Sequence, residues 1–142
     1  MAEPGAGWAE RPKLVIDASL VVAVAFAEPE RDVALAQMRG RTLYAPSLID
    51  YEVANVALSK IRCKAVTAAE AQRSAGIFGE MAIERWDIEL APVVRIGEQF
   101  GLTAYDAAYL WVAGRLRSPI ATFDARVAKA AASYLKQLPP SS

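Results

Sequence analysis

Short apolar runs alternate with longer amphipathic or apolar segments along most of the chain. The runs are brief and are apolar on both sides, which is typical of strands in a parallel sheet covered on both faces. The longer segments between them carry helix start and stop signals. This alternation predicts an α/β domain with three layers, α/β/α, around a short-stranded, mainly parallel sheet. The runs interpreted as strands lie at 14–16, 42–45, 88–91 and 119–122.

Local signals define the expected helices. Thr67 with Glu70 forms a capping-box pattern, which begins a helix predicted to reach Trp86. A second such pattern, Thr103 with Asp106, begins a helix predicted to reach residue 116. Further helices are expected over 19–27, 47–62, 93–100 (ended by Gly101) and 125–132, and an edge strand over 134–137.

The length of 142 residues suits one domain. We expect a flexible leader over 1–12, one folded domain over 13–138 and a tail over 139–142, since Pro, Gly and polar residues gather at both ends. The apolar run 14–27 contains Asp17 and is too short to span a bilayer, and no signal-peptide core precedes it. A cytoplasmic location is therefore the expectation.

Composition narrows the chemistry. There is one cysteine and no histidine, which excludes an intramolecular disulfide, a Cys-rich zinc site and a Ser-His-Asp arrangement. Any catalysis must use carboxylates, hydroxyls, Lys or Arg, or a hard metal ion. The formal net charge is zero, so an anionic substrate would be held by local basic clusters or through metal ions. The hydrophobic share of 54% leaves apolar surface for a second copy or another partner.

Three aspartates lie where strands end or helices begin. Asp17 directly follows the first predicted strand, and Asp124 lies just past the last one. Asp106 is the third residue after Thr103 at the start of a helix. Each has a simple alternative as a helix-capping residue, because Asp is favoured at and just after the N-cap. Both roles are compatible, since helix starts and strand carboxyl ends share one edge of such a sheet.

Glu52 is harder to explain as a structural residue. It lies in a helix that is apolar around most of its circumference, where it shares one narrow polar stripe with Asn55 and Ser59. The stripe either faces solvent or faces a polar site inside the molecule. Glu52 together with Asp17, Asp106 and Asp124 would supply the oxygen ligands that Mg²⁺ or Mn²⁺ prefers. Such a cation would offset their mutual repulsion.

At these residues the sequence resembles the PIN-domain family, and within it the VapC-type toxins of type II toxin–antitoxin pairs. The matching segments cover roughly 14–138 and occur in the family's order and spacing. Asp17 and Asp106 match through Val-Ile-Asp-Ala-Ser and Thr-Ala-Tyr-Asp-Ala-Ala-Tyr-Leu, while Glu52 and Asp124 match through Glu-Val-Ala-Asn-Val and Ala-Thr-Phe-Asp.

The resemblance implies a PIN-like fold and Mg²⁺- or Mn²⁺-dependent endoribonuclease activity, with Asp17, Glu52, Asp106 and Asp124 as metal ligands and catalytic residues. It also implies a homodimer and a cognate antitoxin protein. Supporting polar residues by this resemblance are Ser19, Asn55 and Thr122.

Arg126 and Lys129 follow Asp124 closely, and we interpret them as RNA phosphate contacts. For Tyr105, Tyr109 and Trp111 we favour core or dimer packing over base stacking. Two other Mg²⁺-binding folds, the haloacid-dehalogenase-type phosphatase and the response-regulator receiver, fit less well because only one acid follows the first strand. A PIN-fold binding module without catalysis remains the alternative function.

Overall fold

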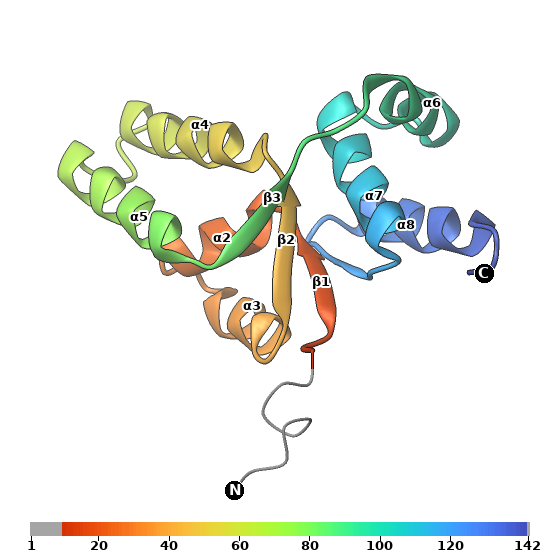
Figure 1. The fold of residues 1–142 in the computed structure, drawn as a ribbon. Coiled ribbons are helices and arrows are strands. Elements are labelled where there is room, and N and C mark those ends of the chain that lie inside the picture. The colour runs from red at the N-terminus through yellow and green to blue at the C-terminus, as the bar shows by residue number, and fades with distance from the viewer. Residues whose placement is uncertain (1–9, 142) are drawn as a thin grey trace, which may run out of the picture.

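The computed structural model describes residues 10–141, and its centre is a four-stranded, all-parallel sheet. The strand order is β3-β2-β1-β4, so the chain runs outward from β1 to one edge and later returns to the other (Figure 1). The parallel sheet expected from the apolar runs is confirmed. The strands are β1 (Lys13–Ile16), β2 (Thr42–Pro46), β3 (Ile83–Trp86) and β4 (Ile120–Ala121).

Helices cover both faces of this sheet, which makes the predicted three layers (Figure 1). On one side α2 packs on α3, α4 and α5, and on the other side α7 packs on the sheet and on α6 and α8. The helices of the first side are α2 (Ala18–Ala25), α3 (Arg31–Met38), α4 (Ile49–Arg62) and α5 (Ala68–Glu80). Those of the second side are α6 (Leu90–Phe100), α7 (Ala104–Leu116) and α8 (Ala125–Gln137).

The two central elements are β1 and α7, and their sequences explain their position. Leu14, Val15 and Ile16 of β1 are all at most 5% exposed, as expected for a strand buried on both faces. Every residue of α7 from Ala107 to Ala113 is buried, so this helix is apolar around its whole circumference. The residues that follow β1 and begin α7 therefore lie at the middle of the molecule's carboxyl edge.

The apolar pattern places the third strand wrongly. It lies at Ile83–Trp86, where it pairs with β2, while Leu90 and Ala91 belong to α6 and α5 ends earlier than expected, at Glu80. The reason is that β3 is an edge strand in which only Ile83 is buried, so it lacks the continuous apolar run of a central strand.

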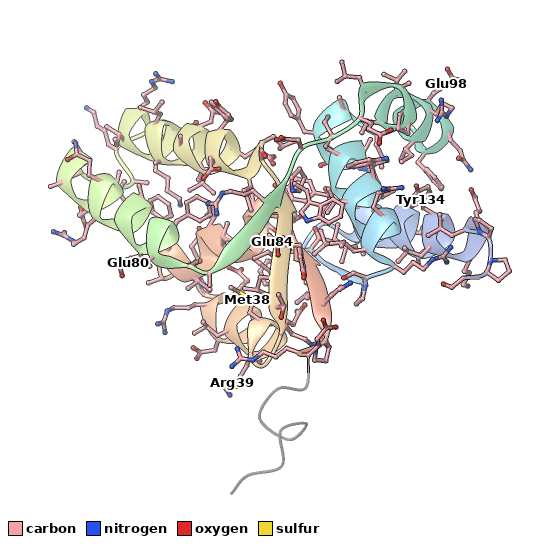
Figure 2. The ribbon with its side chains drawn as sticks, in the orientation of Figure 1. Met38, Arg39, Glu80, Glu84, Glu98 and Tyr134 are labelled. Carbon is pink, nitrogen blue, oxygen red and sulfur yellow. The ribbon has the colours of Figure 1, made fainter. Side chains whose placement is uncertain are left out.

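The predicted edge strand over 134–137 is also wrong, because these residues complete α8. Val127, Ala130, Ala131 and Tyr134 recur at helical spacing and face the core. Tyr134 extends from α8 to the side chains of α6, where its ring meets Phe100 edge-on with centroids 6.1 Å apart (Figure 2).

Most of the leader expected over 1–12, and Ser142 of the expected tail, lie outside the described residues. Among residues 10–141, no helix has the length and apolar character needed to cross a membrane.

Candidate metal and catalytic site

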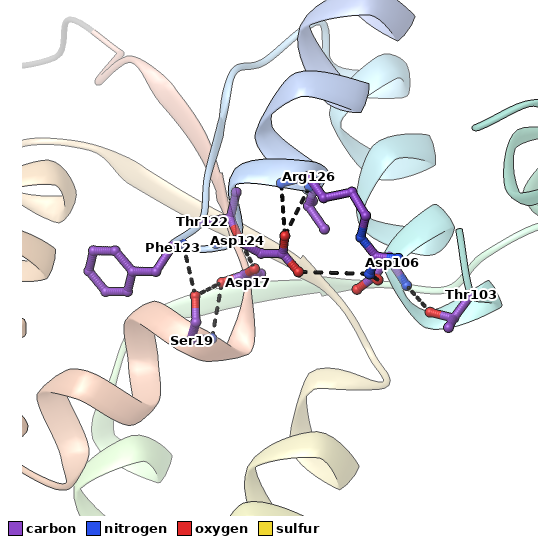
Figure 3. Close-up of polar contacts among 9 residues, drawn as sticks. Asp17, Ser19, Thr103, Asp106, Thr122, Phe123, Asp124 and Arg126 are labelled. Atoms are coloured by element: carbon purple, nitrogen blue, oxygen red, sulfur yellow. Dashed lines mark hydrogen bonds and ion pairs between the residues drawn. The ribbon is translucent and has the colours of Figure 1, made fainter. Parts of the chain in front are cut away.

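Asp17 joins β1 to α2, and three hydroxyl or amide groups converge on its carboxylate. Its Oδ1 accepts from the amide and the hydroxyl of Ser19 at 3.0 and 2.5 Å, and its Oδ2 accepts from the Thr122 hydroxyl. The Ser19 hydroxyl in turn accepts from the amide of Phe123 at 3.1 Å (Figure 3). Asp17 is thus both the N-cap of α2 and the link between the ends of β1 and β4.

Burial dominates the electrostatics of Asp17. It raises the pKa of the carboxyl above its ordinary value, although the hydrogen bonds from Ser19 and Thr122 oppose this by lowering the pKa. A partly buried carboxylate whose partners are hydroxyl and amide groups has no positive charge beside it to compensate its own. It is therefore well suited to a bound cation.

Glu52 lies in the first turn of α4, half-buried, and faces α7. Its Oε1 accepts a hydrogen bond of 2.6 Å from the hydroxyl of Tyr109, whose side chain is only 2% exposed. Burial raises the pKa of the Glu52 carboxyl, and the negative charges of Asp17 and Asp106 raise it further, against the lowering effect of Tyr109. Glu52 is thus close enough to Asp17 and to Asp106 to be repelled by each of them.

Burial and the neighbouring Glu52 charge raise the pKa of Tyr109 far above its usual value. The protonated phenol is therefore favoured, and it acts as a hydrogen-bond donor that orients Glu52. The packing role predicted for Tyr109 agrees with its burial. The sequence analysis missed its hydroxyl, although Tyr109 lies three residues after Asp106 and hence on the same face of α7.

Asp106 and Asp124 meet through one basic side chain. The Arg126 guanidinium lies 3.4 Å from Asp106 Oδ2 and 3.8 Å from Asp124 Oδ2 (Figure 3). Asp124 also caps α8, because its Oδ1 accepts from the amides of Arg126 and Val127 at 2.9 and 3.3 Å. The amide of Asp106 donates to the Thr103 hydroxyl at 3.2 Å. The helix-capping interpretation is therefore correct for Asp124. For Asp106 the capping-box role expected of its carboxylate is wrong, because only its amide takes part in the cap of α7 while its carboxylate contacts Arg126.

Within residues 10–141, no three Asp, Glu or Cys side chains are arranged as a group that could hold a metal ion. The four acids form a looser set, in which Arg126 occupies the space between Asp106 and Asp124. The donor chemistry nevertheless fits a hard divalent cation, because every polar side-chain atom that faces the set from Asp17, Glu52, Ser19 and Thr122 is oxygen. A cation shared by Asp106 and Asp124 would have to displace the guanidinium.

The remaining predicted residues lie around this set. Ser19 and Thr122 contact Asp17 directly, whereas Asn55 is exposed and lines a hollow beside Glu52. Lys129 is exposed on α8, one turn after Arg126. Arg126, predicted as a phosphate contact, lies against two of the acids in this structure.

An all-parallel α/β domain with carboxylates gathered at the carboxyl edge of its sheet belongs to the class in which that edge carries the functional site. Within this class the chain belongs to the PIN-domain family, since the family model for the PIN domain matches residues 14–133. PIN domains are typically nuclease domains and usually bind divalent metal ions.

Among solved structures, the chain is similar to PAE2754 from Pyrobaculum aerophilum. The sequence identity is 23% and the TM-score is 0.68, over 89% of this chain and 88% of the other. This likeness supports the fold. No curated protein sequence matches the chain.

Proposed function

We propose that this protein is a Mg²⁺- or Mn²⁺-dependent endoribonuclease whose metal ligands and catalytic residues are Asp17, Glu52, Asp106 and Asp124. The observation that carries the proposal is the position of Glu52. This carboxylate is half-buried within repulsive reach of Asp17 and Asp106, and its hydrogen-bond partner is a neutral phenol. Such an arrangement is unfavourable unless a cation joins it.

The chain's own residues would hold and orient that cation. Ser19 and Thr122 fix the carboxylate of Asp17, and Tyr109 fixes that of Glu52. When bound, a divalent ion lowers the pKa of a coordinated water and neutralises charge on a phosphodiester oxygen. Once displaced from the acids, Arg126 would be free to contact an RNA phosphate, and Lys129 extends the same basic surface along α8.

We further propose that the protein is the toxin of a toxin–antitoxin pair and forms a homodimer. The support for dimerisation is the outer face of α6, where Leu90 and Val94 lie one turn apart and are 74% and 65% exposed. An antitoxin would hold the nuclease inactive by covering its acidic edge. The resemblance at the four acidic segments, quoted above, supports this cellular role.

The direct test is cleavage of a long RNA by the purified protein with Mg²⁺, Mn²⁺ or excess EDTA. Asp17→Asn and Asp106→Asn should each abolish metal-dependent cleavage while the protein remains folded, because Asn keeps the capping oxygen of Asp17 but loses the charge. Asp32→Asn is the matched control, since Asp32 lies on α3 with its side chain 96% exposed. Equal cleavage by the parent and both site variants would refute the assignment.

The toxin role has its own test. Induced expression should arrest growth, Asp17→Asn should relieve the arrest, and mapping of new RNA 5′ ends after induction should identify the cut RNA. Cleavage in vitro without any growth effect would leave a nuclease that is not a toxin.

A second function, a PIN-fold binding module without catalysis, is favoured by two observations. No three acids of the described residues are grouped for a metal ion, while apolar side chains on α6 are exposed. If the parent protein cuts no RNA with either metal, and neither metal raises its melting temperature, this second function replaces the first.

A further inference from the structure

A hollow of about 590 Å³ lies directly beside Glu52. It is formed where the first turn of α4 faces the first turn of α7, and it opens to solvent. Its lining combines two large aromatic rings, one aliphatic side chain, one amide and one carboxylate. These belong to Leu48, Tyr51, Glu52, Asn55 and Tyr105.

The two tyrosines have matching positions in the sequence. Tyr51 directly precedes Glu52, and Tyr105 directly precedes Asp106. Neighbouring residues of a helix point about 100° apart, so each helix directs its acid toward the acidic set and its tyrosine toward the rim. Tyr51 is 80% exposed and Tyr105 is 62% exposed. Two large aromatic side chains thus remain in solvent on either side of one opening.

The chemistry of the lining selects among ligands. None of the five lining residues is basic, and Glu52 is acidic, so the hollow is unfavourable for a phosphate group. An apolar protein surface would leave the Asn55 amide without a partner and would cover the charged Glu52 carboxylate, whose hydrogen bond from Tyr109 does not neutralise it. A neutral, flat, aromatic group with amino and carbonyl edges fits both the aromatic rings and the polar groups of this lining. It stacks on the phenol rings and pairs with the amide, which both donates and accepts.

We propose that Tyr51 and Tyr105 form a binding subsite for one unpaired nucleobase of the substrate, with Asn55 contacting the edge of that base. The inference rests on the proposed ribonuclease function and adds to it the place where a base of the substrate binds. A base inside a duplex is stacked and paired and cannot enter such a hollow. The base that enters the hollow is therefore unpaired, and the nucleotide next to the cut bond is held by stacking while its phosphate reaches the acids.

Binding of a short single-stranded RNA that contains 2-aminopurine tests the subsite without relying on cleavage. In an Asp17→Asn background with Mg²⁺, stacking should quench the 2-aminopurine fluorescence. Adding Tyr51→Ala or Tyr105→Ala should remove the quenching and weaken binding by roughly 5- to 150-fold, the range for loss of one base–aromatic stack. Tyr51→Phe and Tyr105→Phe should retain both, because the aromatic face remains. Ile77→Ala on α5 is the control for loss of an exposed apolar side chain elsewhere.

A duplex of the same sequence should bind more weakly and give no quenching. If both alanine variants bind the single strand as tightly as the parent and quench equally, the subsite is wrong. If they lose RNA binding only because a dimer dissociates, as seen by light scattering on a sizing column, the tyrosines form a protein interface and the subsite is also wrong.

Failure of the subsite can be separated from failure of the nuclease. With Asp17 intact, metal-dependent cleavage that is unaffected by Tyr51→Ala and Tyr105→Ala would keep the ribonuclease and remove the subsite. If the parent protein never cleaves RNA but binds the labelled strand in a tyrosine-dependent way, the subsite is kept and the ribonuclease is removed. Absence of both cleavage and binding would remove both.

Discussion

The hydrogen bond from Tyr109 to Glu52 allows a quantitative test of the site. Tyr109→Phe removes only the hydroxyl, and the ring keeps its packing because the side chain is 2% exposed and surrounded by core residues. The lost bond is 2.6 Å long and its acceptor is charged, a class worth about 1.5–3 kcal/mol. Glu52 is only half-buried, so in the variant water can hydrogen-bond to its carboxylate and recover part of the lost free energy.

We therefore expect Tyr109→Phe to lower the free energy of unfolding of the metal-free protein by about 1–2 kcal/mol. For a domain of this size, that corresponds to a fall in melting temperature of roughly 3–7 °C. Thermal and urea unfolding in EDTA measure both quantities. Tyr134→Phe is the matched control, because Tyr134 is a half-buried tyrosine that packs between α8 and α6 instead of facing the acids, and this variant should change stability by less than about 0.5 kcal/mol.

A double-mutant cycle isolates the contact. Glu52→Gln keeps an acceptor oxygen but removes the charge, so in that background Tyr109→Phe should cost only about 0.5–1 kcal/mol, as for a neutral hydrogen bond. The difference between the two backgrounds should be about 1 kcal/mol. Two outcomes would show that the charged contact does not exist in solution. In the first, Tyr109→Phe lowers the free energy of unfolding as much in the Glu52→Gln background as in the parent. In the second, its effect in the parent is no larger than that of the Tyr134→Phe control.

Three further perturbations address the charge of Glu52, the role of Arg126 and the cap of α5. Because the pKa of Glu52 is raised by burial and by like charges, the protonated form is favoured in the folded state. Glu52 therefore contributes fully to the free energy of unfolding below about pH 4.5, and this contribution is lost as the pH rises. In EDTA, the difference in free energy of unfolding between Glu52→Gln and the parent should thus shift in favour of the variant from acid to neutral pH, and a shift in favour of the parent would contradict this. Arg126→Gln should tighten Mn²⁺ binding, measured by calorimetry, by about 1.5- to 5-fold, which is the contribution of an exposed ion pair. Unchanged or weaker binding would argue that Arg126 does not compete with the cation for Asp106 and Asp124. Thr67→Ala removes the capping box of α5 and should lower the free energy of urea unfolding by about 1 kcal/mol with RNA cleavage unchanged; a loss of cleavage would link α5 to the site.

The parts of the fold that could be predicted are those specified by local sequence. The central strands carry continuous apolar runs, and the capping patterns at Thr67 and Thr103 mark helix starts that the structure confirms. The edge strand Ile83–Trp86 could not be found in this way, because one of its faces is exposed and its pairing with β2 is a tertiary effect. The same holds for the end of α8, where Tyr134 packs on Phe100 of α6.

The position of the acids was predictable, but their contacts were not. Parallel strands end at one edge, so residues after β1 and β4 must lie near one another, and Asp17 does meet Thr122 there. The direction of a flexible side chain follows from its neighbours in space rather than in sequence. Arg126 therefore reaches Asp106, twenty residues away in the chain, and the exposed pair of tyrosines becomes visible only when α4 and α7 are placed face to face.

The kind of partner given to each acid distinguishes a cation site from a structural cluster. Within the described part of the chain, the two more buried acids, Asp17 and Glu52, meet hydroxyl donors, and no ion pair involves either. Hydroxyl groups orient a carboxylate without neutralising it, whereas a lysine or arginine would do both. The basic group that does pair with the set, Arg126, is 62% exposed, and an exposed ion pair of this kind contributes little and is readily displaced. Stability alone would favour a neutral side chain at position 52, so the oriented, uncompensated carboxylate of Glu52 has the features that the proposed divalent cation would require.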